Sequence, residues 1–359
     1  MSEPRTYKPP AGPATSRVAY AAAHVVAGDE SLDWDTTLAF RRHLWSHGLG
    51  VAEAMDTAQR GMGLDWATTR ELIVRSGEEA LSAGGRIVCG AGTDQLPAGP
   101  ASLEEIAAAY EEQLAVIESV GAVPVLMASR HLAAAASGPE DYAAVYGRLL
   151  AQAGRPVVLH WLGPMFDPAL EGYWGSSDLD VASGALLALI GEHASRIDGV
   201  KISLLDAGRE IDLRRRLPSG VRLYTGDDFN YPELIRGDSE GHSDALLGIF
   251  DPIAPAAAAA LHALDDGDTA SYEEIFGPTV PLARHLFETP TYYYKTGVVF
   301  LAWLTGHQRH FRMVGGLETA RSVPHMTGLF RLADAAGLFP DPDLAAHRMR
   351  AWLTVQGAA

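Results

Sequence analysis

The sequence predicts a single (β/α)8 TIM barrel followed by a C-terminal helical extension, and three observations lead to this fold class. Short apolar, often β-branched runs alternate with longer helical patterns, which is typical of repeated βα units and a parallel sheet. Eight such runs occur, and their starts are mostly about 20 to 45 residues apart, as expected when a helix follows each strand. After the eighth run the chain reads as helices without intervening strands.

The eight runs are the predicted strands of the barrel, taken in chain order. Each is too short for a typical helix, and most are rich in Val, Ile, Leu and Ala. They lie at residues 18–23, 50–54, 86–90, 122–128, 156–160, 199–203, 221–225 and 245–250.

Amphipathic patterns between the runs predict helices over residues 34–47, 66–82, 103–120 and 179–196. Asp33 precedes the first of them as a helix cap, and Ser102 with Glu105 forms a capping-box pattern before the third. We therefore expect a flexible tail over residues 1–16, a barrel over 17–255, and helices over 256–359 that pack on the barrel.

Composition narrows the classes of partner. The 359 residues carry a formal net charge of −17, which would repel nucleic acid and anionic membrane surfaces, so we expect a small-molecule substrate. The single cysteine, Cys89, forms no internal disulfide, and the polar, Pro-rich start of the chain does not resemble a signal peptide. The most apolar stretch, residues 297–304, is too short to span a bilayer. These features predict a cytoplasmic protein with no membrane anchor.

Lysine is rare in this chain, which has only Lys8, Lys201 and Lys295. In the run at 199–203 (Gly-Val-Lys-Ile-Ser), the period-2 alternation of a strand places Lys201 and Ser203 inside the barrel. Burial disfavours the ammonium form and leaves a neutral amine that can attack a carbonyl group. A structural ion pair and a carbamylated lysine that bridges metal ions are the alternative interpretations.

The order of motifs around this lysine resembles the dihydrodipicolinate synthase and N-acetylneuraminate lyase superfamily of class I aldolases. The similar segments are Gly-Val-Lys at 199–201, Gly-Asp-Asp at 226–228 and Asp-Pro-Ile-Ala-Pro at 251–255. The resemblance implies a Schiff-base lysine at Lys201, a structural place for Lys295, and assembly as a dimer or tetramer. No Gly-rich dinucleotide fingerprint opens a first βα turn, and we expect no cofactor.

Two motifs of that superfamily are replaced here. Where it has Gly-Thr-Thr-Gly-Glu for a keto-acid carboxylate, this chain has Asp56, Thr57 and Gln59. Thr57 and Gln59 can donate hydrogen bonds, but the acidic Asp56 is a poor host for a carboxylate. We therefore expect a substrate other than plain pyruvate.

The second replacement is at the end of the fifth run, where His160 stands in place of the superfamily's tyrosine. An imidazole can carry out the proton transfers of Schiff-base chemistry, so we take His160 as the general acid and base. The alternative is a core histidine that bonds to the backbone.

Further strand ends supply candidate substrate-binding residues. Arg130 follows the fourth run and could bind a carboxylate through two hydrogen bonds, or could neutralise nearby acidic loops. Ser203 shares the inward face with the lysine. Asp227 and Asp228 could accept hydrogen bonds from substrate hydroxyls, and their charge argues against a phosphate pocket. The pattern favours a keto acid or a sugar-derived carbonyl compound.

These residues together predict a lyase or aldolase that cleaves by retro-aldol chemistry or dehydrates its substrate through an iminium at Lys201. A metal-dependent isomerase or hydrolase is the first alternative, because His24, His131, His160 and His242 could converge through the fold. No motif with metal-ligand spacing supports it, so we assign no metal. The second alternative is an inactive barrel that serves as a binding or scaffold protein.

Overall fold

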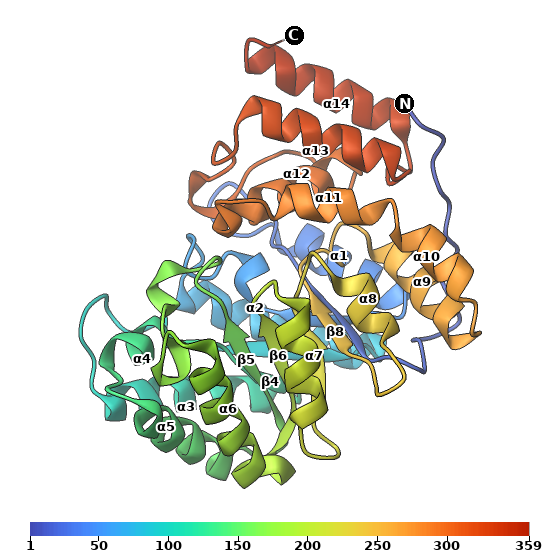
Figure 1. Cartoon of the computed structure of the whole chain (residues 1–359). Coiled ribbons are helices and arrows are strands. Elements are labelled where there is room, and N and C mark those ends of the chain that lie inside the picture. Colours follow the sequence, from blue (N-terminus) through green and yellow to red (C-terminus); the bar gives the residue numbers. More distant parts are fainter. Residues whose placement is uncertain (359) are drawn as a thin grey trace. The chain divides into compact units, whose positions relative to one another are not determined.

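The computed structural model describes residues 1–358, and its eight strands close into a barrel in chain order (Figure 1). Neighbouring strands from the third to the eighth pair in parallel. The strands are β1 (Ala19–Ala22), β2 (Gly50–Glu53), β3 (Ile87–Ala91), β4 (Val123–Leu126), β5 (Val157–Leu162), β6 (Ile197–Ser203), β7 (Arg222–Thr225) and β8 (Asp244–Leu247). The predicted fold class is confirmed.

Helices separate the strands, as the amphipathic patterns predict. Asp33 caps the first of them through the backbone N–H of Thr36, and Ser102 and Glu105 form the expected capping box. The helices are α1 (Trp34–Ser46), α2 (Trp66–Ala83), α3 (Leu103–Ser119), α4 (Arg130–Ala135), α5 (Pro139–Gln152), α6 (Leu179–His193), α7 (Ala207–Arg216) and α8 (Tyr231–Arg236).

Within residues 1–358, six α-helices follow β8, which confirms the C-terminal helical extension. They are α9 (Ala254–Asp265), α10 (Thr269–Phe276), α11 (Thr279–Leu286), α12 (Tyr294–Leu304), α13 (Val323–Ala335) and α14 (Pro342–Val355). The eighth strand ends three residues earlier than predicted, because the backbone turns at Gly248 and the N–H of Asp251 donates to the Gly248 carbonyl. Within residues 1–358, no helix combines the length and the apolar character that a bilayer span requires.

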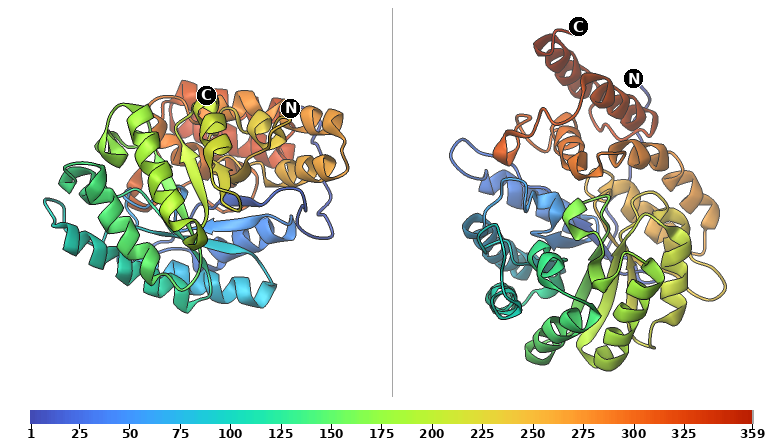
Figure 2. Two further views of the ribbon diagram at one scale, coloured as in Figure 1. Left: turned by 60° about the horizontal axis from the view of Figure 1, so that its bottom comes forward. Right: turned by 60° about the vertical axis from the view of Figure 1, so that its left-hand side comes forward.

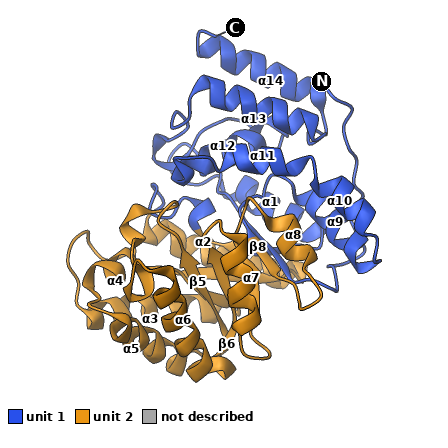
Figure 3. Cartoon of the chain, viewed as in Figure 1, with its two compact units in different colours: residues 1–51, 56–64, 247–359 blue, residues 52–55, 65–246 orange. Residues whose placement is uncertain are grey.

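Contacts group the chain into two compact units, shown in blue and orange in Figure 3. Unit 1 comprises residues 1–51, 56–64 and 247–359, and unit 2 comprises residues 52–55 and 65–246. In unit 1 the N-terminal segment has no helix, but its backbone donates hydrogen bonds from Arg5 to Gly337 and from Thr15 to Asp265. The division into residues 1–16, 17–255 and 256–359 stays a prediction.

Unit 2 holds the strands β3 to β7 and β8 up to Leu246, together with helices in which α3 packs against α5 and α5 against α6 (Figure 2). Every residue of β5 is buried, and β6 is buried except for Asp198. In the register of these strands, Lys201 of β6 lies beside His160 of β5 on one side and Tyr224 of β7 on the other. The sheet thus places three polar side chains at matching positions of adjacent strands.

A buried carboxyl group fastens α7 to the ends of β7 and β8 in unit 2. Glu210 has no solvent exposure, and its two oxygens accept hydrogen bonds from Thr225 Oγ1 (3.0 Å) and Ser243 Oγ (2.7 Å). Burial, its largest influence, raises the pKa of Glu210 to about 8. The carboxyl group is therefore largely protonated at neutral pH.

A pH-dependent stability follows from this raised pKa. The folded chain holds the Glu210 proton more tightly than the unfolded chain does. The contribution of this proton to the unfolding free energy is therefore fully present below about pH 4.5 and is lost as the pH rises through about 8. We predict that Glu210→Gln removes roughly 3 kcal/mol of the fall in unfolding free energy between pH 5 and pH 8. Denaturant unfolding at both pH values measures it, and the exposed Glu192→Gln variant is the control. An unchanged pH dependence in Glu210→Gln contradicts the assignment.

Candidate active site

Lys201 lies on the barrel strand β6 and is 8% exposed. Its neighbour on the same face, Ser203, is 2% exposed. Both side chains reach toward the end of β7, because a Cβ atom on Gly226 would lie 2.8 Å from Lys201 Cε and 2.1 Å from Ser203 Oγ. The inward orientation predicted by strand alternation is thus consistent with the packing of both residues.

His160 is fully buried and lies next to Lys201 in the register of β5 and β6. Its Nε2 is 3.2 Å from Ser203 Oγ, and its Nδ1 has no hydrogen-bond partner. Burial, reinforced by the charge of Lys201, holds the pKa of His160 well below its usual value of 6.5. At neutral pH the imidazole is uncharged, and it can accept a proton.

Gly226 provides the space that this group of side chains needs. Its backbone N–H donates to the Ile202 carbonyl (2.8 Å), which brings the β7 end close to β6. Only a residue without a Cβ leaves room there for Lys201 and Ser203. Sequence reasoning quoted this glycine as part of a motif but gave it no function, and the close approach of its backbone could not be read from the local pattern.

The two aspartates after Gly226 are both buried, and Asp227 is engaged with its own loop. Asp227 Oδ1 accepts hydrogen bonds from the backbone N–H groups of Phe229 and Asn230, and Oδ2 accepts from Asn230 Nδ2. These bonds fix the turn that leads into α8. Asp228 is 4% exposed.

Arg130 is the first residue of α4, and its side chain is about half exposed. Its Nε donates to Asp167 Oδ2 at 2.5 Å. This pair corresponds to the second interpretation of Arg130, in which the guanidinium neutralises an acidic loop. Exposed ion pairs of this kind contribute little to stability.

Asp56, Thr57 and Gln59 belong to unit 1, in and after a short 3₁₀ helix (Asp56–Ala58). Thr57 Oγ1 is 2.8 Å from the hydroxyl of Tyr294, and Gln59 Nε2 donates to the Val314 carbonyl at 3.2 Å. Both side chains therefore bond to the C-terminal helices and loops of unit 1. Asp56 is partly exposed.

The third lysine, Lys295, is held in an aromatic setting in unit 1. It is 2% exposed, and its ammonium lies 4.2 Å from the ring centre of Tyr292 and 5.1 Å from that of Tyr294. Its Nζ also donates to the Tyr292 carbonyl at 3.4 Å. Cation–π contacts stabilise the charged form, which agrees with a structural place for this lysine.

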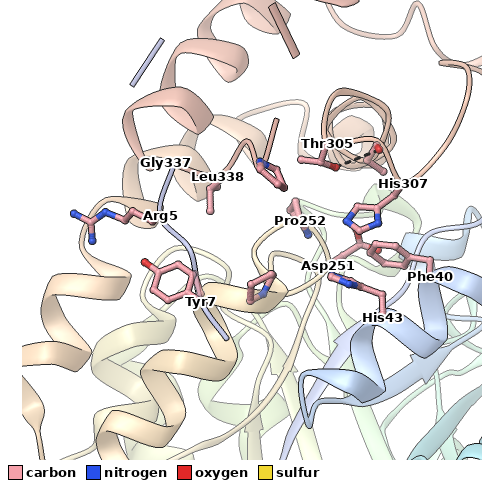
Figure 4. Close-up of a pocket in the computed structure, with 14 residues that line it drawn as sticks. Arg5, Tyr7, Phe40, His43, Asp251, Pro252, Thr305, His307, Gly337 and Leu338 are labelled. Carbon is pink, nitrogen blue, oxygen red and sulfur yellow. Dashed lines mark hydrogen bonds between the residues drawn. The ribbon is translucent and has the colours of Figure 1, made fainter. Parts of the chain in front are cut away.

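Unit 1 also contains a cavity of about 130 Å³ that sequence reasoning did not anticipate (Figure 4). Arg5 and Tyr7 of the N-terminal segment line one side of it, and Phe40, His43 and His307 line the other. Burial is the main reason that the pKa of His43 falls to about 3 and that of His307 to about 4. Both rings are uncharged at neutral pH.

A hydrogen-bonded pair adjoins this cavity. Asp251, another of its lining residues, follows β8, and its Oδ2 accepts from both Nδ1 and the backbone N–H of His24 at 2.8 Å. Both side chains are fully buried. Within the described residues, no group with metal-ligand spacing includes His24, His131, His160 or His242. The histidines named for a metal-dependent isomerase thus do not form such a group.

The fold defines a class of protein, a (β/α)8 barrel with the fold of the dihydrodipicolinate synthases. Solved structures show this fold at low identity. The dihydrodipicolinate synthase from Thermotoga maritima is 14% identical, with a TM-score of 0.68 over 90% of this chain and 99% of that chain. The 4-hydroxy-tetrahydrodipicolinate synthase from Methylacidiphilum fumariolicum is 15% identical, with a TM-score of 0.69 over 89% and 95% of the two chains.

A family model places the chain more specifically than the fold does. Residues 1–358 match the family described as a protein of unknown function, DUF993, and the chain belongs to that family. No curated protein matches the sequence. The structural likeness thus confirms the fold that the resemblance implied, and the chemistry is argued from the residues themselves.

The close packing around Gly226 can be tested by substitution. Gly226→Ala inserts a methyl group between Lys201 and Ser203, so we expect a loss of about 1–3 kcal/mol in unfolding free energy from overpacking. Denaturant unfolding measures the loss. The matched control is Gly191→Ala on α6, where a Cβ meets no atom within 4 Å and helix propensity favours alanine. Equal effects of the two substitutions would show that Gly226 does not make this space.

Proposed function

We propose that the protein is a Schiff-base-forming lyase or aldolase that acts on a small carbonyl compound through Lys201. The observation that carries the proposal is the pairing of a buried lysine with an uncharged imidazole at matching positions of adjacent barrel strands. Perturbed groups of this kind cluster at functional sites, and barrel chemistry is found at the carboxyl ends of the strands.

The proposed reaction begins when the ammonium group of Lys201 loses a proton to water and its Nζ attacks the carbonyl carbon of the substrate. A C–N bond forms, the carbonyl oxygen takes up a proton, and loss of water from the carbinolamine leaves an iminium. In retro-aldol cleavage the substrate hydroxyl loses its proton, the C–C bond breaks, an aldehyde leaves and the iminium becomes an enamine, which takes up a proton at carbon to form an iminium again. In dehydration a C–H bond breaks to give the enamine, which expels a hydroxyl group as water and forms an unsaturated iminium. Water then hydrolyses the iminium to product and free lysine, so the cycle consumes no oxidant and needs no cofactor.

His160 and Ser203 are suited to the proton transfers in this cycle. The uncharged imidazole accepts the proton that the attacking amine loses and returns it to the departing hydroxyl group. Ser203 Oγ, 3.2 Å from His160 Nε2, can pass that proton between the ring and the substrate. We assign His160 as the general acid and base, and Ser203 as a substrate-binding group that also relays protons.

The surroundings of Lys201 disfavour a phosphorylated substrate. Asp227 and Asp228 lie buried at the end of β7, where many barrels build a phosphate site, and their charges oppose a phosphate. Arg130 pairs with Asp167 at the surface. We therefore propose a keto acid or a sugar-derived carbonyl compound as the substrate class, with retro-aldol cleavage or dehydration as the reaction.

The test uses the scarcity of lysine in this chain. The full protein is incubated with pyruvate, 2-oxobutyrate, dihydroxyacetone or fructose, reduced with borohydride, digested and mapped by mass spectrometry. We predict a single reduced adduct on the peptide that contains Lys201. It disappears in Lys201→Met, and it stays in Lys8→Met, which removes an exposed lysine of the N-terminal segment.

His160→Gln provides the companion measurement. Glutamine keeps a hydrogen-bonding group near Ser203 but cannot exchange protons, so the rate of adduct formation should fall by about 100-fold while Lys201 remains the modified residue. The Schiff-base proposal fails if no carbonyl compound modifies Lys201, or if Lys201→Met retains full turnover of a compound that the protein converts.

A further inference from the structure

Three potential ligand side chains meet in unit 1, where α11 ends and α13 begins. His285 is in the last turn of α11, Glu288 follows that helix, and His325 is in the first turn of α13. His325 Nδ1 is 2.7 Å from Glu288 Oε1, and His285 Nδ1 is 3.5 Å from Glu288 Oε2. One ligand atom from each residue lies within 4.8 Å of the other two.

The second ring nitrogen of His285 is held by the backbone. Its Nε2 is 2.8 Å from the backbone carbonyl oxygen of His325, to which it donates a hydrogen bond. This bond turns Nδ1 toward a carboxylate oxygen of Glu288, 3.5 Å away, and a cation can bind between the two atoms. Metal-bound histidines usually donate their second N–H to a carbonyl or carboxylate, as His285 does here.

A glycine makes this arrangement possible. Gly328 is inside α13, and a Cβ there would lie 2.8 Å from His285 Nε2 and 3.0 Å from His285 Cε1. A glycine in a helix interior costs about 1 kcal/mol relative to alanine. The cleared space lets the His285 ring lie against α13 and stack on His325, with ring centres 4.3 Å apart.

The Glu288 side of this three-residue cluster is open to solvent. The side chain of His325 is 6% exposed, and its Nε2 has no hydrogen-bond partner, whereas that of Glu288 is 48% exposed. Arg321 lies close by, but its guanidinium donates to the backbone carbonyls of Glu288 and Pro290. Solvent therefore reaches the carboxylate, while the imidazole of His325 is enclosed and that of His285 is 22% exposed.

We propose that His285, Glu288 and His325 bind a divalent transition metal ion, with Zn²⁺ as the best match, and that this ion joins α11 to α13. Two imidazole nitrogens and one carboxylate oxygen are a known zinc ligand set, and a water molecule from the exposed side completes four-coordination. Tetrahedral bonds of about 2.1 Å separate the ligand atoms by about 3.4 Å. When the ion binds, His325 Nδ1 and Glu288 Oε1 therefore move apart from 2.7 Å, and ligand atoms that are up to 4.8 Å apart move together. The ion is structural, and this site is independent of the chemistry proposed for Lys201.

The experiment uses the full chain after treatment with a chelator. Zn²⁺ is titrated calorimetrically, Co²⁺ is titrated by visible absorption, and the thermal midpoint is measured with and without Zn²⁺. We expect one ion per chain, a tetrahedral Co²⁺ spectrum, and a rise of several degrees in the midpoint. His325→Ala and Glu288→Gln should weaken Zn²⁺ binding at least 30-fold.

Two controls keep the proposal falsifiable. His347→Ala removes an exposed histidine of α14 and should leave binding unchanged, and circular dichroism verifies that each variant is folded. The proposal is overturned if folded wild-type protein binds no Zn²⁺ at 100 µM. Equal loss of binding in His347→Ala, or full binding in His325→Ala, also overturns it.

Discussion

The lysine amine enclosed by β5, β6 and β7 is the constraint on which the rest of the candidate site depends. Burial of an ammonium group inside a barrel costs free energy, and the neighbours of Lys201 on adjacent strands set its surroundings. His160 is held uncharged at its side, and Gly226 leaves space over its Cε atom. A substitution at His160 or Gly226 therefore changes the immediate surroundings of the Lys201 amine directly.

The helices and strands could be predicted from the sequence because each of them has a local pattern of apolar and capping residues. Buried parallel strands read as apolar runs, and the period-2 alternation of β6 is enough to place Lys201 and Ser203 on one face. The capping residues Asp33 and Ser102 marked helix starts correctly. The end of β8 was misplaced, because the apolar residues that follow Leu247 belong to a turn whose geometry depends on Gly248 and Asp251.

The roles of the loop residues were harder to predict from the sequence, because the fold determines which hydrogen-bond partners they meet. Asp227 reads as a free acid in the sequence, yet both of its oxygens hold the turn before α8. The direction of Arg130 toward Asp167 depends on the path of a loop 37 residues away. The Asp56, Thr57 and Gln59 segment bonds within unit 1, and its part in substrate binding stays a prediction, as do the oligomeric state and the cytoplasmic location.

If Lys201 acts as proposed, it forms an imine with a carbonyl substrate at equilibrium. Nitrogen NMR of the full chain labelled with ¹⁵N at lysine Nζ observes this bond without a trapping reagent, and three lysines give a spectrum that is simple to assign. When a carbonyl compound that the protein converts is added, we expect the Lys201 signal alone to move to the iminium region. If all three signals remain at amine positions while the compound is turned over, Lys201 does not form the imine.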